Sequence, residues 1–422
     1  MRKSRTIATD TMVCGMLHVQ KMSRPVHPAG LVSRPWSLSQ TGAFVKRPAS
    51  LLRLAAMAAA ALAAASPAAL AEVKPIVWTF TPKSKLTFYG QVDLGILSYD
   101  DGKDTDVYAP VDNGNSTSRL GYWIQSDLNG GWTFRGNLEI EYTPSSSKLV
   151  NQKTDTTDWD INKSNVRKAE ITFGNKTYGA VWLGQGSMAT DNISEIDISG
   201  TSVAAYSAVS DIAAGNYYRF VDAGLSNINV GSTFSNFDGS RRFRARYDTP
   251  TFLDGFTASI AYGQEQIKDN DDNDYYDAAL RYTGEFAGFK AQAGIGYSDL
   301  GSDTTIWSGS ASVIHVKTGI SATVALGEQD KNGATSNSGY LKLGLLRPFF
   351  KVGKTGLSID YQKSDEVKAQ NTSADSVGLA VVQNFDKQNL EVYAVLRQYD
   401  YDAPGTSYDD GLALFTGVRF KF

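Results

Sequence analysis

Residues 412–422 read LALFTGVRFKF, and this stretch decides the fold class. Every second position from Leu412 to Phe422 is mostly apolar, whereas the opposite face carries Arg419 and Lys421. A period-2 strand that ends on an aromatic residue is typical of the last strand of an outer-membrane β-barrel. Such a strand must pair with the first one, because only closure leaves a sheet without open edges in lipid. The stretch therefore predicts a transmembrane barrel.

The same alternation recurs along the chain. Residues 132–143 place Trp132, Phe134 and Leu138 opposite Arg135 and Glu139. The strand candidates run for about 9–13 residues, the length that a tilted strand needs to cross a membrane, whereas soluble strands average nearer 5–6. We therefore predict an all-β fold, a transmembrane antiparallel β-barrel.

Connections between these strands are alternately short and long. The short ones include residues 128–131, 175–178, 253–255, 286–288 and 385–389. The long polar ones include residues 100–117, 144–163, 268–274, 329–338, 364–373 and 400–410. Turns on one side and loops on the other are typical of a barrel with periplasmic turns and extracellular loops.

We predict sixteen strands, an even number that lets both termini lie on one side of the membrane. Their expected starts lie near residues 86, 117, 132, 164, 179, 242, 256, 275, 289, 305, 318, 338, 355, 374, 390 and 410. Residues 187–241 are then a single insertion. Its strand-like pieces YYRF and INVGSTF leave eighteen strands as the alternative, although they alternate poorly and are short.

The segment 46–71 has the pattern of a secretory signal peptide. Three basic residues flank or precede an apolar core at 54–65, and ALA at 69–71 is a small-x-small cleavage site. About 12 apolar residues cannot cross a membrane core that needs roughly 20. We therefore expect a cleaved presequence, 1–71, and a single barrel domain, 72–422. Because a signal peptide normally lies near the first residue, we expect translation to start near Val45.

Composition excludes several classes of protein. Nine of the 41 Lys and Arg residues and one of the 44 Asp and Glu residues lie before residue 72, which leaves 32 against 43 and a net charge of −11. No basic excess remains to neutralise nucleic-acid phosphates. The only cysteine, Cys14, lies in the presequence. No stretch of 18 consecutive apolar residues follows residue 71, which excludes a helical membrane protein.

Three segments resemble the general diffusion porins of Gram-negative bacteria, especially the α- and β-proteobacterial type. They are RFRARYDTPTFLDGFTASIAYG at 242–263, SRLGYWIQSDLNGGWTFRGNLEIEY at 118–142 and GAVWLGQG at 179–186. The resemblance implies a trimeric, water-filled outer-membrane channel for passive diffusion of ions and small hydrophilic solutes. It also implies that a long third loop, here residues 187–241, folds into the lumen and constricts the pore. This insertion is longer than in simple family members, so the path of the loop is not carried over.

The resemblance also implies binding partners. It implies a homotrimer, contact with outer-membrane lipid and lipopolysaccharide, and recognition of the last strand, which ends in Phe422, by the barrel assembly machinery. No nucleic acid is expected.

Five arginines are candidates for a basic pore wall. Arg242, Arg244 and Arg246 share one strand face, and each would cost about 2–4 kcal/mol if it faced lipid at the midplane. That face is therefore predicted to line the lumen. Arg119 and Arg135 lie on the polar faces of their own strands. Arg167 is in phase with apolar neighbours, which predicts that it lies at the outer interface instead.

Opposite this wall we expect acids of the insertion. The segment DNISEIDIS contains Asp191, Glu195 and Asp197. Bases on the wall and acids on the loop would set a transverse field that orients dipolar solutes and tunes ion selectivity. The alternative is that these charges only solvate the loop and pair with one another. The arginines favour anions and the negative total charge favours cations, so the sign of selectivity stays open.

No catalytic residue or cofactor is predicted. The segment DNDDND could bind Ca²⁺ through Asp269, Asp271, Asp272 and Asp274, but it lacks the glycine and terminal glutamate of a helix–loop–helix site, so a solvated loop is the alternative. A barrel enzyme would need a nucleophile with a general base, and His315 is the only histidine after residue 71. The remaining alternatives are a substrate-specific channel for anions, phosphate or sugars, and a structural barrel.

Overall fold

The computed structural model describes residues 74–143, 145–154 and 161–422. The predicted signal peptide, 46–71, and the rest of the predicted presequence, 1–71, lie outside the described residues and stay predictions. Within the described ranges, no helix combines the length and the apolar character that crossing a membrane requires.

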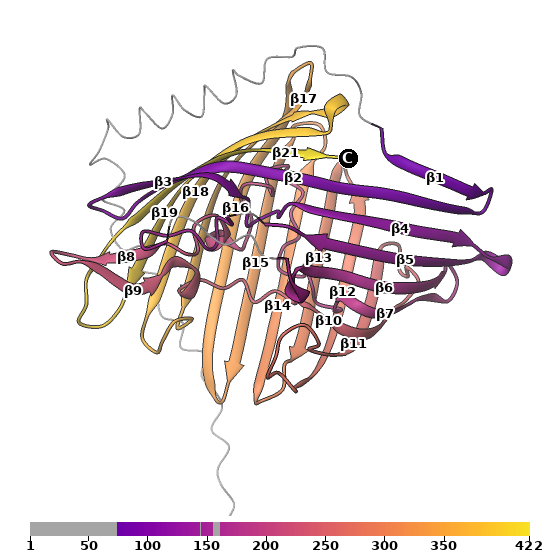
Figure 1. The fold of residues 1–422 in the computed structure, drawn as a ribbon, viewed down its shortest axis with the longest axis horizontal. Coiled ribbons are helices and arrows are strands. Elements are labelled where there is room, and N and C mark those ends of the chain that lie inside the picture. The colour runs from indigo at the N-terminus through magenta and orange to yellow at the C-terminus, as the bar shows by residue number, and fades with distance from the viewer. Residues whose placement is uncertain (1–73, 144, 155–160) are drawn as a thin grey trace, which may run out of the picture. The chain divides into compact units, whose positions relative to one another are not determined.

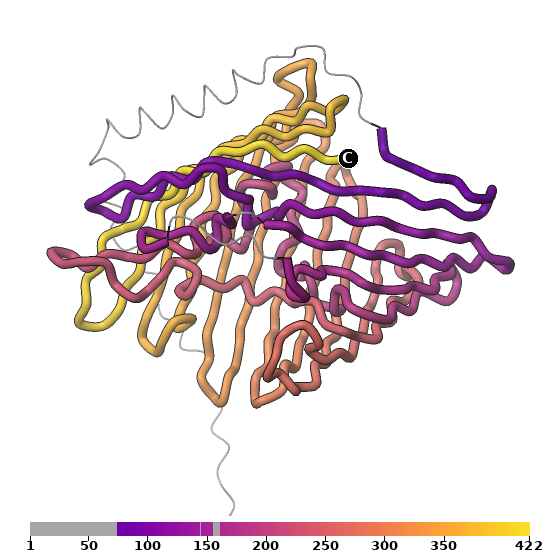
Figure 2. The backbone as a smooth tube through the Cα atoms, in the orientation of Figure 1, coloured from indigo at the N-terminus to yellow at the C-terminus, as the bar shows by residue number. Residues whose placement is uncertain are grey.

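Sixteen antiparallel strands close into a ring, in which each strand pairs with its neighbour in the chain and β21 pairs back to β2 (Figures 1 and 2). The ring strands are β2 (Ser84–Asp100), β4 (Arg119–Asp127), β5 (Trp132–Glu141), β6 (Val166–Asn175), β7 (Gly179–Ser187), β10 (Arg241–Asp248), β11 (Phe256–Gln264), β12 (Asp274–Phe286), β13 (Phe289–Asp299), β14 (Thr304–His315), β15 (Ile320–Lys331), β16 (Ala334–Phe350), β17 (Gly353–Asp365), β18 (Ser373–Phe385), β19 (Leu390–Asp402) and β21 (Gly411–Lys421).

The prediction of a sixteen-strand transmembrane barrel is confirmed, and each predicted start lies within four residues of the observed one. The eighteen-strand alternative is wrong, because neither YYRF nor INVGSTF adds a strand to the ring. YYRF becomes β8 (Tyr217–Phe220), and only the first two residues of INVGSTF are strand, at the end of β9 (Leu225–Asn229). β8 and β9 join β20 (Tyr408–Asp409) in a separate three-stranded sheet. Short 3₁₀ helices complete the described elements: η1 (Asn129–Gly131), η2 (Lys163–Asn165), η3 (Val209–Ile212), η4 (Val230–Ser232) and η5 (Asp386–Gln388).

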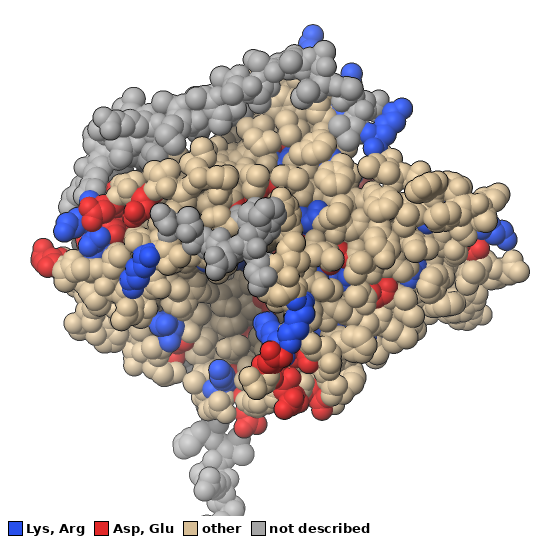
Figure 3. Space-filling view, viewed as in Figure 1, with Lys and Arg blue, Asp and Glu red and all other residues tan. Residues whose placement is uncertain are grey.

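Each ring strand has one apolar face and one polar face. In β16, Leu341 and Leu343 are 53% and 54% exposed, whereas Lys342 between them is 1% exposed. An apolar face that stays accessible on a closed barrel is the face that meets lipid. Figure 3 shows this outer surface as a broad band with few charged side chains. Below, the opposite face is called the polar face.

Two further strands extend the sheet at the seam between the first and last ring strands. β21 pairs with residues 91–100 of β2, and beyond it Phe422 exchanges two backbone hydrogen bonds with Gly90, at 3.0 and 3.1 Å. Nearer the N-terminal end of β2, β1 (Ile76–Thr81) pairs with residues 84–88 on the same edge. On the other edge, β4 covers residues 84–91 and β3 (Thr105–Asp112) covers residues 94–100. The long first strand is therefore paired on both sides over most of its length.

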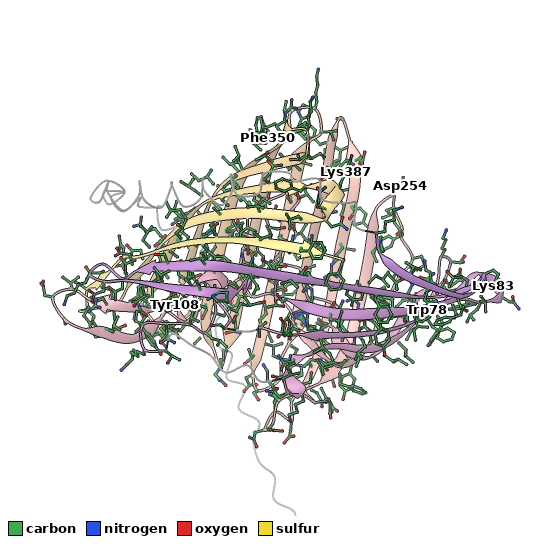
Figure 4. The ribbon with its side chains drawn as sticks, turned by 45° about the horizontal axis from the view of Figure 1, so that its top comes forward. Trp78, Lys83, Tyr108, Asp254, Phe350 and Lys387 are labelled. Carbon is green, nitrogen blue, oxygen red and sulfur yellow. The ribbon has the colours of Figure 1, made fainter. Side chains whose placement is uncertain are left out.

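Turns and loops separate to opposite ends, as predicted. Phe350, Lys387, Asp254 and Lys83, which lie in or next to four short connections, run from the top to the right of Figure 4, and Tyr108 of β3 lies at the left. The backbone N–H of Asp127 donates to the carbonyl of Lys83 at 2.8 Å, so the turn between β1 and β2 lies beside the end of β4, where the β4–β5 turn begins.

The seam predicts that the substitution Gly90→Ala destabilises the barrel. A Cβ at Gly90 would lie 2.6 Å from the Phe422 ring and 2.8 Å from the carbonyl oxygen of Arg119, so the chain ends must move apart. We expect a loss of about 1–3 kcal/mol, as for other overpacked sites. The matched control is Gly136→Ala in β5, where an added Cβ meets no atom within 4 Å. The stability of each variant is measured as the urea concentration at which half of the folded band on an unheated SDS gel is lost. Equal concentrations for the two variants would contradict the predicted destabilisation at Gly90.

Candidate functional site

The connection between β7 and β10, residues 188–240, is called the insertion. Its first part hydrogen-bonds to the polar faces of successive strands. The carboxylate of Asp277 in β12 accepts from the backbone N–H groups of Ala189 and Thr190, at 3.1 and 2.8 Å. The hydroxyl of Ser310 in β14 accepts from the N–H of Ile196 at 3.0 Å. Side chains of the barrel wall therefore satisfy backbone groups of the insertion that no strand ladder satisfies.

A buried ion pair holds the next part of the insertion. Nζ of Lys342 lies 2.6 Å from Asp197 and donates to the carbonyl of Ala205 at 2.7 Å. The two charged side chains are 0% and 3% exposed. One strand further on, the hydroxyl of Thr201 donates to Ser358 of β17 at 2.9 Å. The charge of the predicted pore acid Asp197 is thus matched by Lys342.

An apolar cluster anchors the far part of the insertion. Leu97 in β2 and Phe415 in β21 are fully buried on the polar faces of their strands, beside Tyr393 of β19. The cluster members from the insertion are Val203, Ala204, Ala205, Val209, Ile212, Ala213, Tyr218, Val230 and Phe234. Sequence reasoning missed this cluster, although the presence of apolar residues on both faces of 412–422 was the available signal.

The three predicted arginines of β10 share the polar face, and each has an acidic partner. The pairs are Arg242–Glu265 at 3.5 Å, Arg244–Glu170, and Arg246–Asp248 at 2.7 Å. Arg246 also donates to the carbonyl of Met188 at 2.9 Å, where the insertion begins. Local pairing therefore balances most of the positive charge of this ladder.

Arg119 and Arg135 differ from that ladder. They lie on the polar faces of β4 and β5, where Arg119 is opposite Glu141 and Arg135 is opposite Gln125 in the strand register. Among the described residues, neither guanidinium has an ion pair within 4 Å or a hydrogen bond. Arg119 also interacts electrostatically with Arg167 and with the carboxylate of Glu139. These two positions therefore carry positive charge on the wall that no close ion pair holds.

The prediction that Arg167 lies at the outer interface is wrong. The β5–β6 register shifts between Glu139, which pairs with Lys168, and Ile140, which pairs with Val166, so Arg167 is the extra residue of a bulge. A bulge reverses the alternation beyond it. Arg167 consequently reaches Glu139 and Glu141, each at 2.7 Å.

The other two predicted pore acids lie near each other at the base of the insertion. Asp191 accepts from the hydroxyl of Ser187 at 2.6 Å, and Glu195 accepts from the amide of Asn236 at 3.0 Å. Burial, with a smaller contribution from Asp238, raises the pKa of Glu195 well above its usual range. Burial therefore favours the uncharged form of Glu195, and the charge of Asp197 is matched by Lys342.

Asp238 is a functional candidate that sequence reasoning missed. Its carboxylate accepts from the backbone N–H groups of Asn192 and Ser194, at 2.7 and 2.8 Å, and so ties the two ends of the insertion together. Burial, and then the nearby Asp191, raise the pKa of Asp238 to about 7. No local pattern links positions so far apart in the chain, which is why the sequence showed no signal.

The proposed calcium ligands have separate partners. Asp269 pairs with Lys163 at 2.5 Å, and Asp271 and Asp274 accept from Tyr275 and Tyr262, at 2.6 and 2.7 Å. Within the part of the chain that the structure describes, no three His, Cys, Asp or Glu residues gather to hold a metal ion. A calcium site at residues 269–274 stays an untested prediction.

The family model described as Gram-negative porin matches residues 58–404. A search of curated sequences finds no match.

Several solved structures are similar to this chain. The anion-selective porin from Comamonas acidovorans has 19% sequence identity and a TM-score of 0.55, and the alignment covers 81% of this chain and 100% of that one. The Salmonella typhi OmpF complex with daunomycin has 14% identity and a TM-score of 0.53, with 83% and 100% covered. The trimer form of OmpT, an outer membrane protein of Vibrio cholerae, has 15% identity and a TM-score of 0.50, with 81% and 100% covered.

The buried Lys342–Asp197 pair predicts that Lys342→Met loosens the insertion without opening the barrel. Removing one partner of a buried ion pair costs about 3–5 kcal/mol, because the remaining charge is left without compensation. We expect limited proteolysis to cut within residues 188–240 of the variant, while the barrel still runs as a folded band. The double variant Lys342→Met/Asp197→Asn should regain much of the protection. Lys363→Met, which removes a lysine from an exposed pair in β17, is the control. Equal protection of both single variants would contradict the anchoring role of the pair.

Proposed function

This chain belongs to the Gram-negative porin family and is an outer-membrane diffusion channel, and on that premise we propose a route for solutes through it. The insertion folds into the lumen and narrows it from one side. Its hydrogen bonds, ion pair and apolar contacts fall on the polar faces of β12, β14, β16, β17, β19, β21 and β2. The water-filled path then runs along the polar faces of β4 to β7, which carry Arg119 and Arg135.

The positive charge on that wall sets the selectivity. Arg119 and Arg135 have no ion pair within 4 Å among the described residues, whereas Lys342 balances Asp197 and burial favours the neutral form of Glu195. Charged side chains at the narrow part of a pore act on ions at short range, where dissolved salt screens the electrostatic interaction least. We infer a general diffusion channel with a weak preference for anions. A channel specific for one anion is the alternative, favoured by the same pair of arginines.

We also propose that the protein works as a homotrimer and catalyses no reaction. The Vibrio cholerae relative in its trimer form supports the first point. His315 supports the second, because its Nδ1 hydrogen-bonds to Thr318 in the short β14–β15 connection and its ring packs against Phe289. Contacts with lipopolysaccharide, and with the assembly machinery through Phe422, belong to the same proposal.

Charge removal at the wall tests the route. In the double variant Arg119→Gln/Arg135→Gln, the reversal potential in a salt gradient should shift toward cations, because the path has lost two positive charges. Single channels in planar bilayers give the measurement, and a large KCl conductance of the unmodified protein tests the channel itself. Arg347→Gln is the control, since Arg347 lies outside the wall and donates to Lys317 near the turns. An unchanged reversal potential in the double variant would sink the proposed route.

The pKa of Asp238 predicts a pH dependence of that selectivity. As the pH falls through about 7, Asp238 gains a proton and one negative charge disappears from the insertion. Anion preference should therefore increase between pH 8 and pH 6. Asp238→Asn should remove this change and hold the channel at its acidic value, whereas Asp254→Asn in an exposed turn should leave it intact. Reversal potentials at three pH values measure it, and the same pH profile in Asp238→Asn and the unmodified protein would count against the assignment.

A further inference from the structure

Two aromatic side chains lie side by side on the polar faces of β2 and β4. The rings of Tyr89 and Trp123 have centroids 6.4 Å apart and planes inclined by 25°. They fall on the stretch of wall that the insertion contacts described above do not reach. Both side chains are partly exposed, so an apolar ring surface stays open on a face that is otherwise polar.

Tyr89 is fixed flat against the wall. It lies opposite Gly121 in the register of β2 and β4, and a Cβ at Gly121 would fall 2.6 Å from the Tyr89 ring carbon Cζ. The ring therefore covers the backbone at a place where only glycine leaves room. Its hydroxyl donates to Glu139 at 2.8 Å and accepts from the amide of Asn137 at 3.0 Å, both on β5. A ring held this way presents one face to the interior.

Two arginines without an ion pair within 4 Å among the described residues border the pair of rings. Arg119 is opposite Gln91, one step beyond Tyr89 along the polar face, and it contributes to the electrostatic environment of Tyr89. On the other side, Trp123 pairs with Asn137, so Arg135 is its diagonal neighbour on the same face. Diagonal neighbours have their Cα atoms about 7–8 Å apart, within reach of a long side chain. The indole N–H of Trp123 also has no hydrogen bond among the described residues and is free to donate.

These four side chains combine the two parts that recognise a ring with a carboxylate. Aromatic faces stack against the flat face of an arene or the apolar C–H face of a sugar ring, and guanidinium groups bind carboxylates with two parallel hydrogen bonds. We propose that Tyr89, Trp123, Arg119 and Arg135 form a solute subsite on the channel wall for a ring that bears a carboxylate. The subsite rests on the proposed function, because it requires solutes to pass along this wall. It makes such solutes dwell in the channel longer than their size and charge alone would cause.

Block of the KCl current through the purified channel tests the subsite. Benzoate and glucuronate are the ring acids, acetate is the carboxylate without a ring, and glucose is the ring without a charge. We expect a ring acid to reduce the current at concentrations at least about fivefold lower than acetate or glucose, consistent with the strength of aromatic pairing. Block by benzoate alone assigns an arene, and block by glucuronate as well assigns a flat apolar ring face in general. Equal block by all four solutes would overturn the proposal.

Substitutions test which side chains cause the block of the current. In Trp123→Leu we expect the blocking concentration of benzoate to rise about 2- to 10-fold. The matched control is Trp307→Leu, since Trp307 is 56% exposed on the outer face of β14. Arg135→Gln should raise the blocking concentration of benzoate without changing that of glucose, and it serves if Trp123→Leu does not fold. Unchanged benzoate block in the folded variants disproves the subsite, whereas absence of KCl conductance in the unmodified protein disproves the channel.

Discussion

Every backbone N–H and C=O group that meets lipid must be hydrogen-bonded within the protein, and this constraint governs the structure. The barrel meets it by pairing β2 with β21 and ending the chain where Phe422 bonds to Gly90. Because β2 continues past that point, its free edge would be open without β1. The position of the chain end thus explains why a strand outside the ring is present. The fixed inner and outer faces of all sixteen strands follow from the same closure.

Closure creates a polar interior, and the insertion is arranged on it in two physically different ways. Near its start, single hydrogen bonds and the buried Lys342–Asp197 pair satisfy polar groups one by one. Farther along, Leu97, Phe415 and their neighbours bury apolar surface instead. Both kinds of anchor lie on one part of the wall. The asymmetry of the proposed route follows from this division, since the opposite part keeps its side chains available to solutes.

Pairing decides which charges can act on a solute. The β10 arginines looked strongest from their spacing, yet each has an acid beside it. Arg119 and Arg135 are single arginines on their strands and have no close acidic partner of this kind among the described residues. Electrostatic influence in a narrow channel depends on this local balance and not on the number of basic residues.

Alternation in the sequence determined the fold class, the number of ring strands and the polar face of β10, because a period of two residues is a local property of one strand. It could not place Arg167, since a bulge arises from pairing between two strands and reverses the phase. It could not foresee that β1 covers an edge, because this depends on where the distant chain end lies. The pairing of Asp197 with Lys342 and the seating of Tyr89 over Gly121 likewise join segments that only closure of the barrel brings together. Tertiary structure alone therefore decided which side chains of the polar face remain open to a solute.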